Sequence, residues 1–122
     1  MGSKIKLLIV DDEDGLRTLL KSEMEAHGFE ADEADGGNMA LEMLKKSSYD
    51  VVILDILMPD ISGIKVLRDI RSNKIPTKVI MLTGVNELKL AQESMQLGAN
   101  DFLTKPVEPR IIADCITRVM KE

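Results

Sequence analysis

The stretch Val51-Val52-Ile53-Leu54-Asp55 is a continuous aliphatic run that ends in an acidic residue. Short runs rich in β-branched residues, with Asp, Pro or Gly close by, are typical of strands buried on both faces of a sheet. Similar runs stand at 7–10 and 79–82, and weaker strand patterns lie at 30–34 and 101–104. We therefore predict five short strands.

Amphipathic stretches follow these strands, and each carries apolar residues at helical spacing. Residues at the expected boundaries also indicate helices: Ser62 is typical of a helix start, and Gly28 and Gly98 are typical of helix ends. The expected stripes are Leu16, Leu19, Leu20 and Met24; Met39, Ala40, Met43 and Leu44; Ile64, Leu67 and Ile70; Leu88, Ala91 and Met95; and Ile112, Cys115, Ile116 and Val119. Five repeats of strand then helix predict an α/β fold, a doubly wound five-stranded parallel sheet, (βα)5, with helices on both faces.

The composition is that of an ordinary globular protein, with 122 residues, 44% hydrophobic and 30% charged. No linker interrupts the pattern, so we expect one domain over residues 4–122. The net charge of -5 and the lack of a basic run argue against direct nucleic-acid binding. No apolar run is long enough for a membrane span, and Cys115, the single cysteine, fits a reducing cytoplasm. Gly36-Gly37 belongs to no nucleotide-binding fingerprint.

Chemically active side chains stand where the predicted strands end. Asp11 and Asp12 follow the first strand, Asp55 ends the third, Thr83 ends the fourth and Lys105 follows the fifth. In open α/β sheets, ligands bind beyond the carboxyl ends of the strands. We therefore expect three carboxylates, one hydroxyl and one ammonium group to converge on one edge.

Such a cluster is suited to a divalent cation and a phosphoryl group. Neighbouring carboxylates repel one another unless a cation lies among them, and oxygen ligands without His or Cys favour Mg²⁺ over zinc. A carboxylate is also a nucleophile toward phosphoryl groups, whose oxygens Lys105 and Thr83 could hold. Taken singly, each residue has an ordinary explanation: a turn former, a helix cap or a solvated loop residue. The five together indicate a site.

Four segments carry a resemblance to a known family. They are Ile9-Val10-Asp11-Asp12-Glu13, then Leu54-Asp55-Ile56-Leu57-Met58-Pro59 with Gly63, then Met81-Leu82-Thr83-Gly84, and Gly98-Ala99-Asn100-Asp101-Phe102-Leu103-Thr104-Lys105-Pro106. In order and spacing the chain resembles the response regulator receiver domain (CheY-like) of bacterial two-component systems over nearly its full length. The resemblance implies the strand order 2-1-3-4-5.

The resemblance also implies roles for individual residues. Asp55 resembles the aspartate that is phosphorylated, and Lys105, with Thr83, the residues that contact the phosphoryl group. Asp12, Asp55 and the backbone carbonyl of Leu57 resemble the direct ligands of Mg²⁺, which Mn²⁺ can replace, with Asp11 acting through water. Thr83 and Phe102 resemble a switch pair. The Lys105–Pro106 bond is expected to be cis.

The partner implied is a histidine kinase or phosphotransfer protein, with the signal leaving through the fourth helix, fifth strand and fifth helix to an output domain or a second copy. The chain would be a signalling domain, not an enzyme beyond its own phosphorylation and dephosphorylation. Two alternatives are a pseudo-receiver binding module and an aspartyl-nucleophile phosphatase. The phosphatase needs an acidic residue where Leu57 stands. Ile111, Cys115 and Met120 widen the last apolar stripe, which indicates either a deeply buried helix or a docking patch.

Overall fold

The structure, a computed structural model, describes residues 3–122 and contains a five-stranded sheet with the order β2-β1-β3-β4-β5. The strands are β1 Lys6–Val10, β2 Glu30–Ala34, β3 Val51–Asp55, β4 Lys78–Thr83 and β5 Asp101–Thr104. The helices are α1 Asp14–Ala26, α2 Gly37–Lys46, α3 Gly63–Ser72, α4 Leu88–Gln96 and α5 Pro109–Met120, with a short 3-10 turn, η1, at Val85–Glu87. All neighbouring strands pair in parallel. The predicted fold class and strand order are confirmed.

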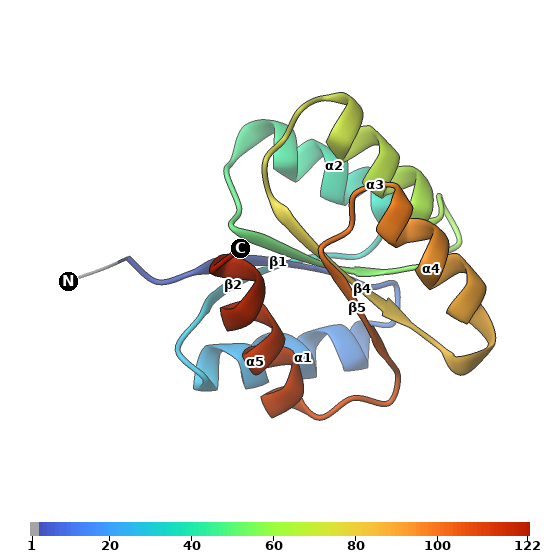
Figure 1. Ribbon diagram of the computed structural model, residues 1–122. Coiled ribbons are helices and arrows are strands. Elements are labelled where there is room, and N and C mark those ends of the chain that lie inside the picture. Colours follow the sequence, from blue (N-terminus) through green and yellow to red (C-terminus); the bar gives the residue numbers. More distant parts are fainter. Residues whose placement is uncertain (1–2) are drawn as a thin grey trace.

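Helices cover both faces of the sheet. Figure 1 shows α2, α3 and α4 on one side and α1 with α5 on the other. Alternate residues of the central strands point to opposite faces, so Leu8 and Val10 of β1 join the core under α2–α4, while Leu7 and Ile9 join the core under α1 and α5. This is why the central strands are aliphatic without alternation. Among residues 3–122, no helix is long and apolar enough to cross a membrane.

The predicted helix boundaries are found at three positions. The Ser62 side chain accepts a hydrogen bond from the Lys65 backbone N–H at the start of α3. Gly28 and Gly98, which follow α1 and α4, have φ angles of 94° and 106°, a conformation that glycine adopts without strain. Helices α1 and α4 therefore end at these glycines, and the chain returns to the sheet.

Several apolar residues assigned to core-facing stripes are exposed, which corrects the predicted core. Helix α1 packs through Leu20 and Met24, and α4 through Ala91 and Ser94. In α4 the small contact residues bring the helix close to the sheet, so that the larger Leu88 and Met95 beside them remain exposed. The exposed members of the predicted stripes are Leu16, Leu19, Met39, Leu88 and Met95.

The apolar stripe of α5 is divided between core and surface. Cys115 is buried and Met120 packs against the core at its edge, whereas Ile111 is exposed. For Cys115 and Met120 the observation favours the buried-helix alternative. Ile111 alone remains as an apolar residue open to solvent on this helix.

Candidate functional site

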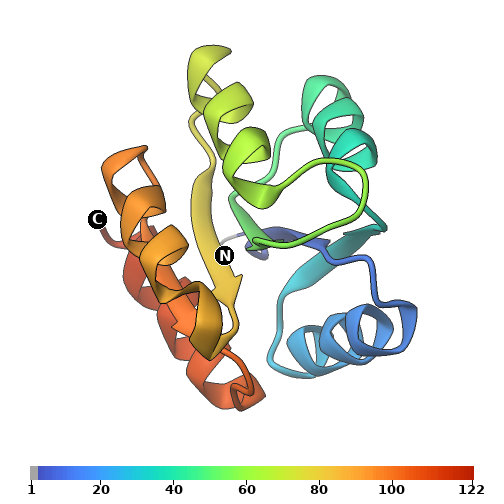
Figure 2. The ribbon, with the colours of Figure 1, turned by 90° about the vertical axis from the view of Figure 1, so that its right-hand side faces the viewer.

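The carboxyl ends of the strands lie on the side of the molecule that faces the viewer in Figure 2. Asp11 and Asp12 directly follow β1, Asp55 is the last residue of β3, and Thr83 is the last residue of β4. Because β1, β3 and β4 are adjacent and parallel, these residues meet at one edge of the sheet. Lys105, which follows β5, joins them from the next strand.

Asp11, Asp12 and Asp55 form an acidic cluster. One carboxylate oxygen of each lies within 4.8 Å of those of the other two. Asp11 and Asp55 are buried, while Asp12 is exposed and leaves the cluster open to solvent. The Glu13 backbone N–H donates to Asp11 Oδ1 at 3.0 Å, which fixes the orientation of that carboxylate.

The ammonium group of Lys105 reaches into this cluster. Its Nζ lies 3.2 Å from Asp55 Oδ1 and 3.4 Å from Asp11 Oδ2. The Lys105 backbone N–H donates to the Thr83 carbonyl at 2.7 Å, which ties the loop after β5 to the end of β4. The Lys105–Pro106 peptide bond is cis. Among the described residues, Lys105 therefore supplies an intramolecular cation to two of the three carboxylates.

Burial and charge act in opposite directions on this ion pair. Burial raises the pKa of Asp55, and the neighbouring charge of Asp11 adds to that effect, while Lys105 opposes it. For Lys105, burial lowers the pKa, but the charges of Asp55 and Asp11 outweigh it, so the pKa of Lys105 is raised overall. Asp55 thus carries a charge that the protein alone compensates incompletely.

The residues of the expected switch pair lie on the same face of the sheet. Thr83 is buried, and its hydroxyl donates to the Gly84 carbonyl at 3.2 Å. Phe102 on β5 pairs in register with Met81 and packs, half-buried, against the core under α4. Met81 and Thr83 are two residues apart on β4, so Thr83 and Phe102 point to the same side.

Two exposed apolar side chains stand in the loops around the cluster. Leu57, two residues after Asp55, is 54% exposed, and Val85, two residues after Thr83, is 64% exposed. Neither side chain can donate or accept a hydrogen bond. Between them, they place apolar surface on two of the loops that leave the carboxyl edge.

Three polar residues that support these loops were not predicted from the sequence. Arg17 donates to the Asp11 carbonyl at 2.9 Å and to Glu33 at 3.0 Å. Glu87 accepts from the Gly84 backbone N–H at 3.1 Å, and Asp60 accepts from two backbone N–H groups of α2. Only the contact of Glu87, three residues from its partner, has a local spacing that could have indicated it.

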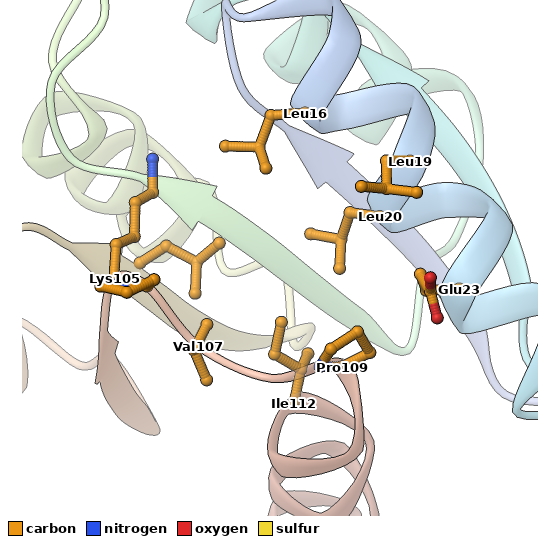
Figure 3. A pocket seen from close by; sticks show the side chains of 10 residues that line it. Leu16, Leu19, Leu20, Glu23, Lys105, Val107, Pro109 and Ile112 are labelled. Atoms are coloured by element: carbon orange, nitrogen blue, oxygen red, sulfur yellow. The ribbon is translucent and has the colours of Figure 1, made fainter.

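An apolar groove of about 480 Å³ lies beside the site. In Figure 3, Leu16, Leu19 and Leu20 of α1 face Val107, Pro109 and Ile112 of the loop after β5 and of α5. Lys105 lies at one side of the groove. The leucines that leave the predicted core of α1 therefore line an open apolar surface next to the acidic cluster.

The donor atoms of the cluster fit a hard divalent cation. Three carboxylates and the carbonyls of the adjoining loops are oxygen donors, and no His or Cys is among the grouped residues. Mg²⁺ binds through a few such oxygens and completes its shell with water and phosphate oxygens. A buried carboxylate, a group of oxygen donors that could hold a cation, and an ammonium group lie in one place, and phosphoryl transfer makes use of such groups.

The chain is similar to a known protein family over most of its length. The model of the response regulator receiver domain family matches residues 7–117. The chain is 40% identical over 105 residues to the transcriptional regulatory protein SrrA of Staphylococcus aureus (strain NCTC 8325 / PS 47), covering 86% of this chain and 43% of that protein. It is also 40% identical over 103 residues to the regulatory protein AtoC of Escherichia coli (strain K12), covering 84% of this chain and 22% of that protein. The chain thus spans less than half the length of these curated relatives.

Solved structures of response regulator proteins are also similar to this chain. A response regulator receiver domain protein from Clostridium thermocellum superposes with a TM-score of 0.91 at 33% identity, covering 95% of this chain and 94% of that chain. The chemotaxis protein CheY4 of Vibrio cholerae superposes with a TM-score of 0.89 at 29% identity, covering 96% of this chain and 99% of that chain.

Proposed function

Since this chain belongs to the response regulator receiver domain family, we propose that it accepts a phosphoryl group on Asp55 from a phosphohistidine of a kinase or phosphotransfer protein. The receiver domain would extend over residues 4–122. The single observation that carries the proposal is the position of Asp55: a buried carboxylate at the end of a central strand, beside two further carboxylates and one ammonium group.

Asp12, Asp55 and the Leu57 carbonyl would hold Mg²⁺ or Mn²⁺, with Asp11 acting through a bound water. When bound, the cation would neutralise the carboxylates and draw charge from the phosphoryl oxygens of the donor. The fit rests on the donor set described above, in which one member, Asp12, is open to solvent.

In the proposed transfer, a carboxylate oxygen of Asp55 attacks phosphorus as the bond from phosphorus to the histidine nitrogen breaks. The electron pair of that bond stays on the imidazole, and an aspartyl phosphate forms. Lys105 would exchange its contact with the Asp55 carboxylate for one with a phosphoryl oxygen. The Thr83 hydroxyl would give up the Gly84 carbonyl and donate to another phosphoryl oxygen.

The chain's own chemistry would be limited to gaining and losing this group, so that its role is signalling. Movement of Thr83 toward the phosphoryl group would leave space on the α4 face of the sheet, where Phe102 is half-buried. A shift of Phe102 would change the surface formed by α4, β5 and α5, which we propose as the contact with an output domain or a second copy.

The groove beside Lys105 supports a protein as the phosphoryl donor. Exposed apolar side chains gathered next to a reactive group are typical of a protein contact and are not needed for a small phosphorylated molecule. We propose that the donor protein packs against Leu16 and Leu19 while it presents its phosphohistidine to Asp55.

A direct test uses beryllofluoride, a mimic of the phosphoryl group, and backbone amide NMR. With Mg²⁺ present, beryllofluoride should shift the amides near Asp55, Thr83 and Lys105 and then those of α4, β5 and α5. Without a divalent cation it should shift none of them. Equal shifts in the presence of EDTA would refute the role assigned to the acidic cluster.

A further inference from the structure

The loop between β3 and α3, residues 56–62, connects the proposed phosphoacceptor to the next helix and contains the proposed carbonyl ligand of Leu57. Its far end is fixed against the strand. The Gly63 backbone N–H donates to the Ile56 carbonyl at 2.7 Å, and a Cβ atom at Gly63 would lie 2.2 Å from the Asp55 carbonyl oxygen. Only glycine permits this approach, so the loop must turn back tightly after Leu57.

The middle of the loop is held by a second contact, made by Asp60. Its Oδ1 accepts from the Gly37 backbone N–H at 3.2 Å, and its Oδ2 accepts from the Asn38 backbone N–H at 2.9 Å. These N–H groups belong to the first turn of α2, where the N-cap residue is Gly36, which has no side chain to cap the helix. A carboxylate more than twenty residues away in sequence therefore does what a local N-cap side chain does in most helices.

The start of α2 is shaped to receive this loop. A Cβ atom at Gly36 would lie 2.9 Å from Asp60 Oδ2, and one at Gly37 would lie 2.4 Å from Ile61 Cγ1. Both contacts are closer than real Cβ atoms tolerate. The Gly36-Gly37 pair, which matches no nucleotide-binding pattern, is thus explained by the close approach of the loop.

We propose that Asp60 is a positioning residue for the metal site: by fastening the loop to α2, it holds the Leu57 carbonyl in place for a divalent cation and so raises the affinity of the site. The inference rests on the proposed function, because it takes the Leu57 carbonyl as a ligand. A carbonyl on a free loop would have to be ordered at the moment of binding, and that loss of freedom would weaken binding. Groups that orient metal ligands typically change metal affinity by about 10–100-fold when they are removed.

The alternative is that Asp60 only caps α2, and a charge-matched double variant separates the two. Asp60→Ala removes both the cap and the tie to the loop. Gly36→Asp combined with Asp60→Ala returns a carboxylate to the start of α2 but does not restore the carboxylate tie between the loop and α2. Gly36 has φ -177° and ψ 178°, an extended conformation open to aspartate, and the carboxylate it would meet is gone.

The control within the same loop is Ser62→Ala. Ser62 caps α3 by accepting from the Lys65 N–H at 3.2 Å, a contact that leaves the tie between Asp60 and α2 in place. Each protein is titrated with Mg²⁺ while backbone amide NMR shifts are recorded, and its thermal unfolding is measured without metal. For Asp60→Ala we expect about tenfold weaker Mg²⁺ binding and a lower melting temperature. For Ser62→Ala we expect a lower melting temperature with Mg²⁺ affinity changed less than about twofold.

The double variant decides the question. We expect its melting temperature to return toward that of the unaltered protein, while its Mg²⁺ binding stays about tenfold weaker than that of the unaltered protein. Recovery of affinity together with stability, or unchanged affinity in Asp60→Ala, would overturn the inference and leave the proposed function standing. If the unaltered protein binds no Mg²⁺, the proposed function fails, and the inference fails with it.

Discussion

Lys105 and Asp55, fifty residues apart in sequence, are in contact at the carboxyl edge of the sheet, with Lys105 Nζ 3.2 Å from Asp55 Oδ1. Even so, burial raises the pKa of Asp55 above its ordinary value. One ammonium group shared between Asp55 and Asp11 therefore does not offset the loss of hydration at Asp55. The metal-free site keeps an excess of negative charge, which a cation would relieve.

This imbalance predicts that Asp55→Asn stabilises the metal-free protein. A raised folded-state pKa means that the stability contributed by Asp55 is fully present below its unfolded value of 3.8 and is lost as pH rises through the folded value. At about pH 7 the unaltered protein should therefore unfold more easily than Asp55→Asn, by on the order of 1 kcal/mol. Urea unfolding in EDTA at several pH values measures the difference.

The same pair of proteins tests the cation. The advantage of Asp55→Asn should shrink as pH falls through the raised folded-state pKa of Asp55, and it should be smallest below 3.8, where Asp55 is neutral in the folded and the unfolded protein. Added Mg²⁺ should stabilise the unaltered protein by mass action and leave Asp55→Asn nearly unchanged. Equal free energies of unfolding for the two proteins at neutral pH in EDTA would show that burial of the charged Asp55 carboxylate does not destabilise the protein.

The exposed Leu57 predicts a long-lived aspartyl phosphate. Neither Leu57 nor Val85 can orient an attacking water by a hydrogen bond, and orientation contributes orders of magnitude to such rates. Leu57→Asn should therefore speed hydrolysis by about tenfold, and Leu57→Val, which keeps an apolar side chain, should not. Loss of phosphorylated protein with time, followed by intact mass, gives both rates. Slower or unchanged hydrolysis in Leu57→Asn would refute the argument.

Thr83 is expected to separate chemistry from signalling. Thr83→Ala removes the buried hydroxyl but leaves the acidic cluster and Lys105 intact, so Asp55 should still be phosphorylated, more slowly because one donor to the phosphoryl oxygens is lost. The change at Phe102 and α5 should be largely lost, which amide exchange with and without beryllofluoride measures. A full response of α4, β5 and α5 in Thr83→Ala would exclude Thr83 as the connection.

The groove on α1 predicts that Leu19→Ser impairs transfer from a protein donor only. Leu19 is 57% exposed, so the substitution should cost little stability. Transfer from a partner kinase should slow by about tenfold, the scale of one buried contact residue, while labelling by acetyl phosphate should change less than about twofold. Met39→Ser, which removes an exposed apolar residue from α2 on the other face of the sheet, is the matched control. Equal slowing in both variants would mean that the groove is not the contact.

The strands and the acidic edge were predictable because their signals are local. Aliphatic runs such as 51–54 require a sheet covered on both faces, and the residue that ends each run must stand at the carboxyl edge. The exposure of Leu19 was not predictable. Helical spacing shows which residues share a face of the helix, but it does not show which of them contact the sheet and which extend beyond its edge. Asp60 was missed for a related reason: its partners Gly37 and Asn38 are brought to it only by the tertiary fold.

The central claim, that Asp55 accepts a phosphoryl group in a cation-dependent reaction, is tested most directly by intact mass after incubation with acetyl phosphate. With Mg²⁺ present, the protein should gain the mass of one phosphoryl group, and Asp55→Asn should gain none. With EDTA in place of Mg²⁺, the unaltered protein should also gain none, since the negative charge of Asp11, Asp12 and Asp55 would then repel the anionic donor. A phosphoryl group gained by Asp55→Asn, or gained without a divalent cation, would contradict the account.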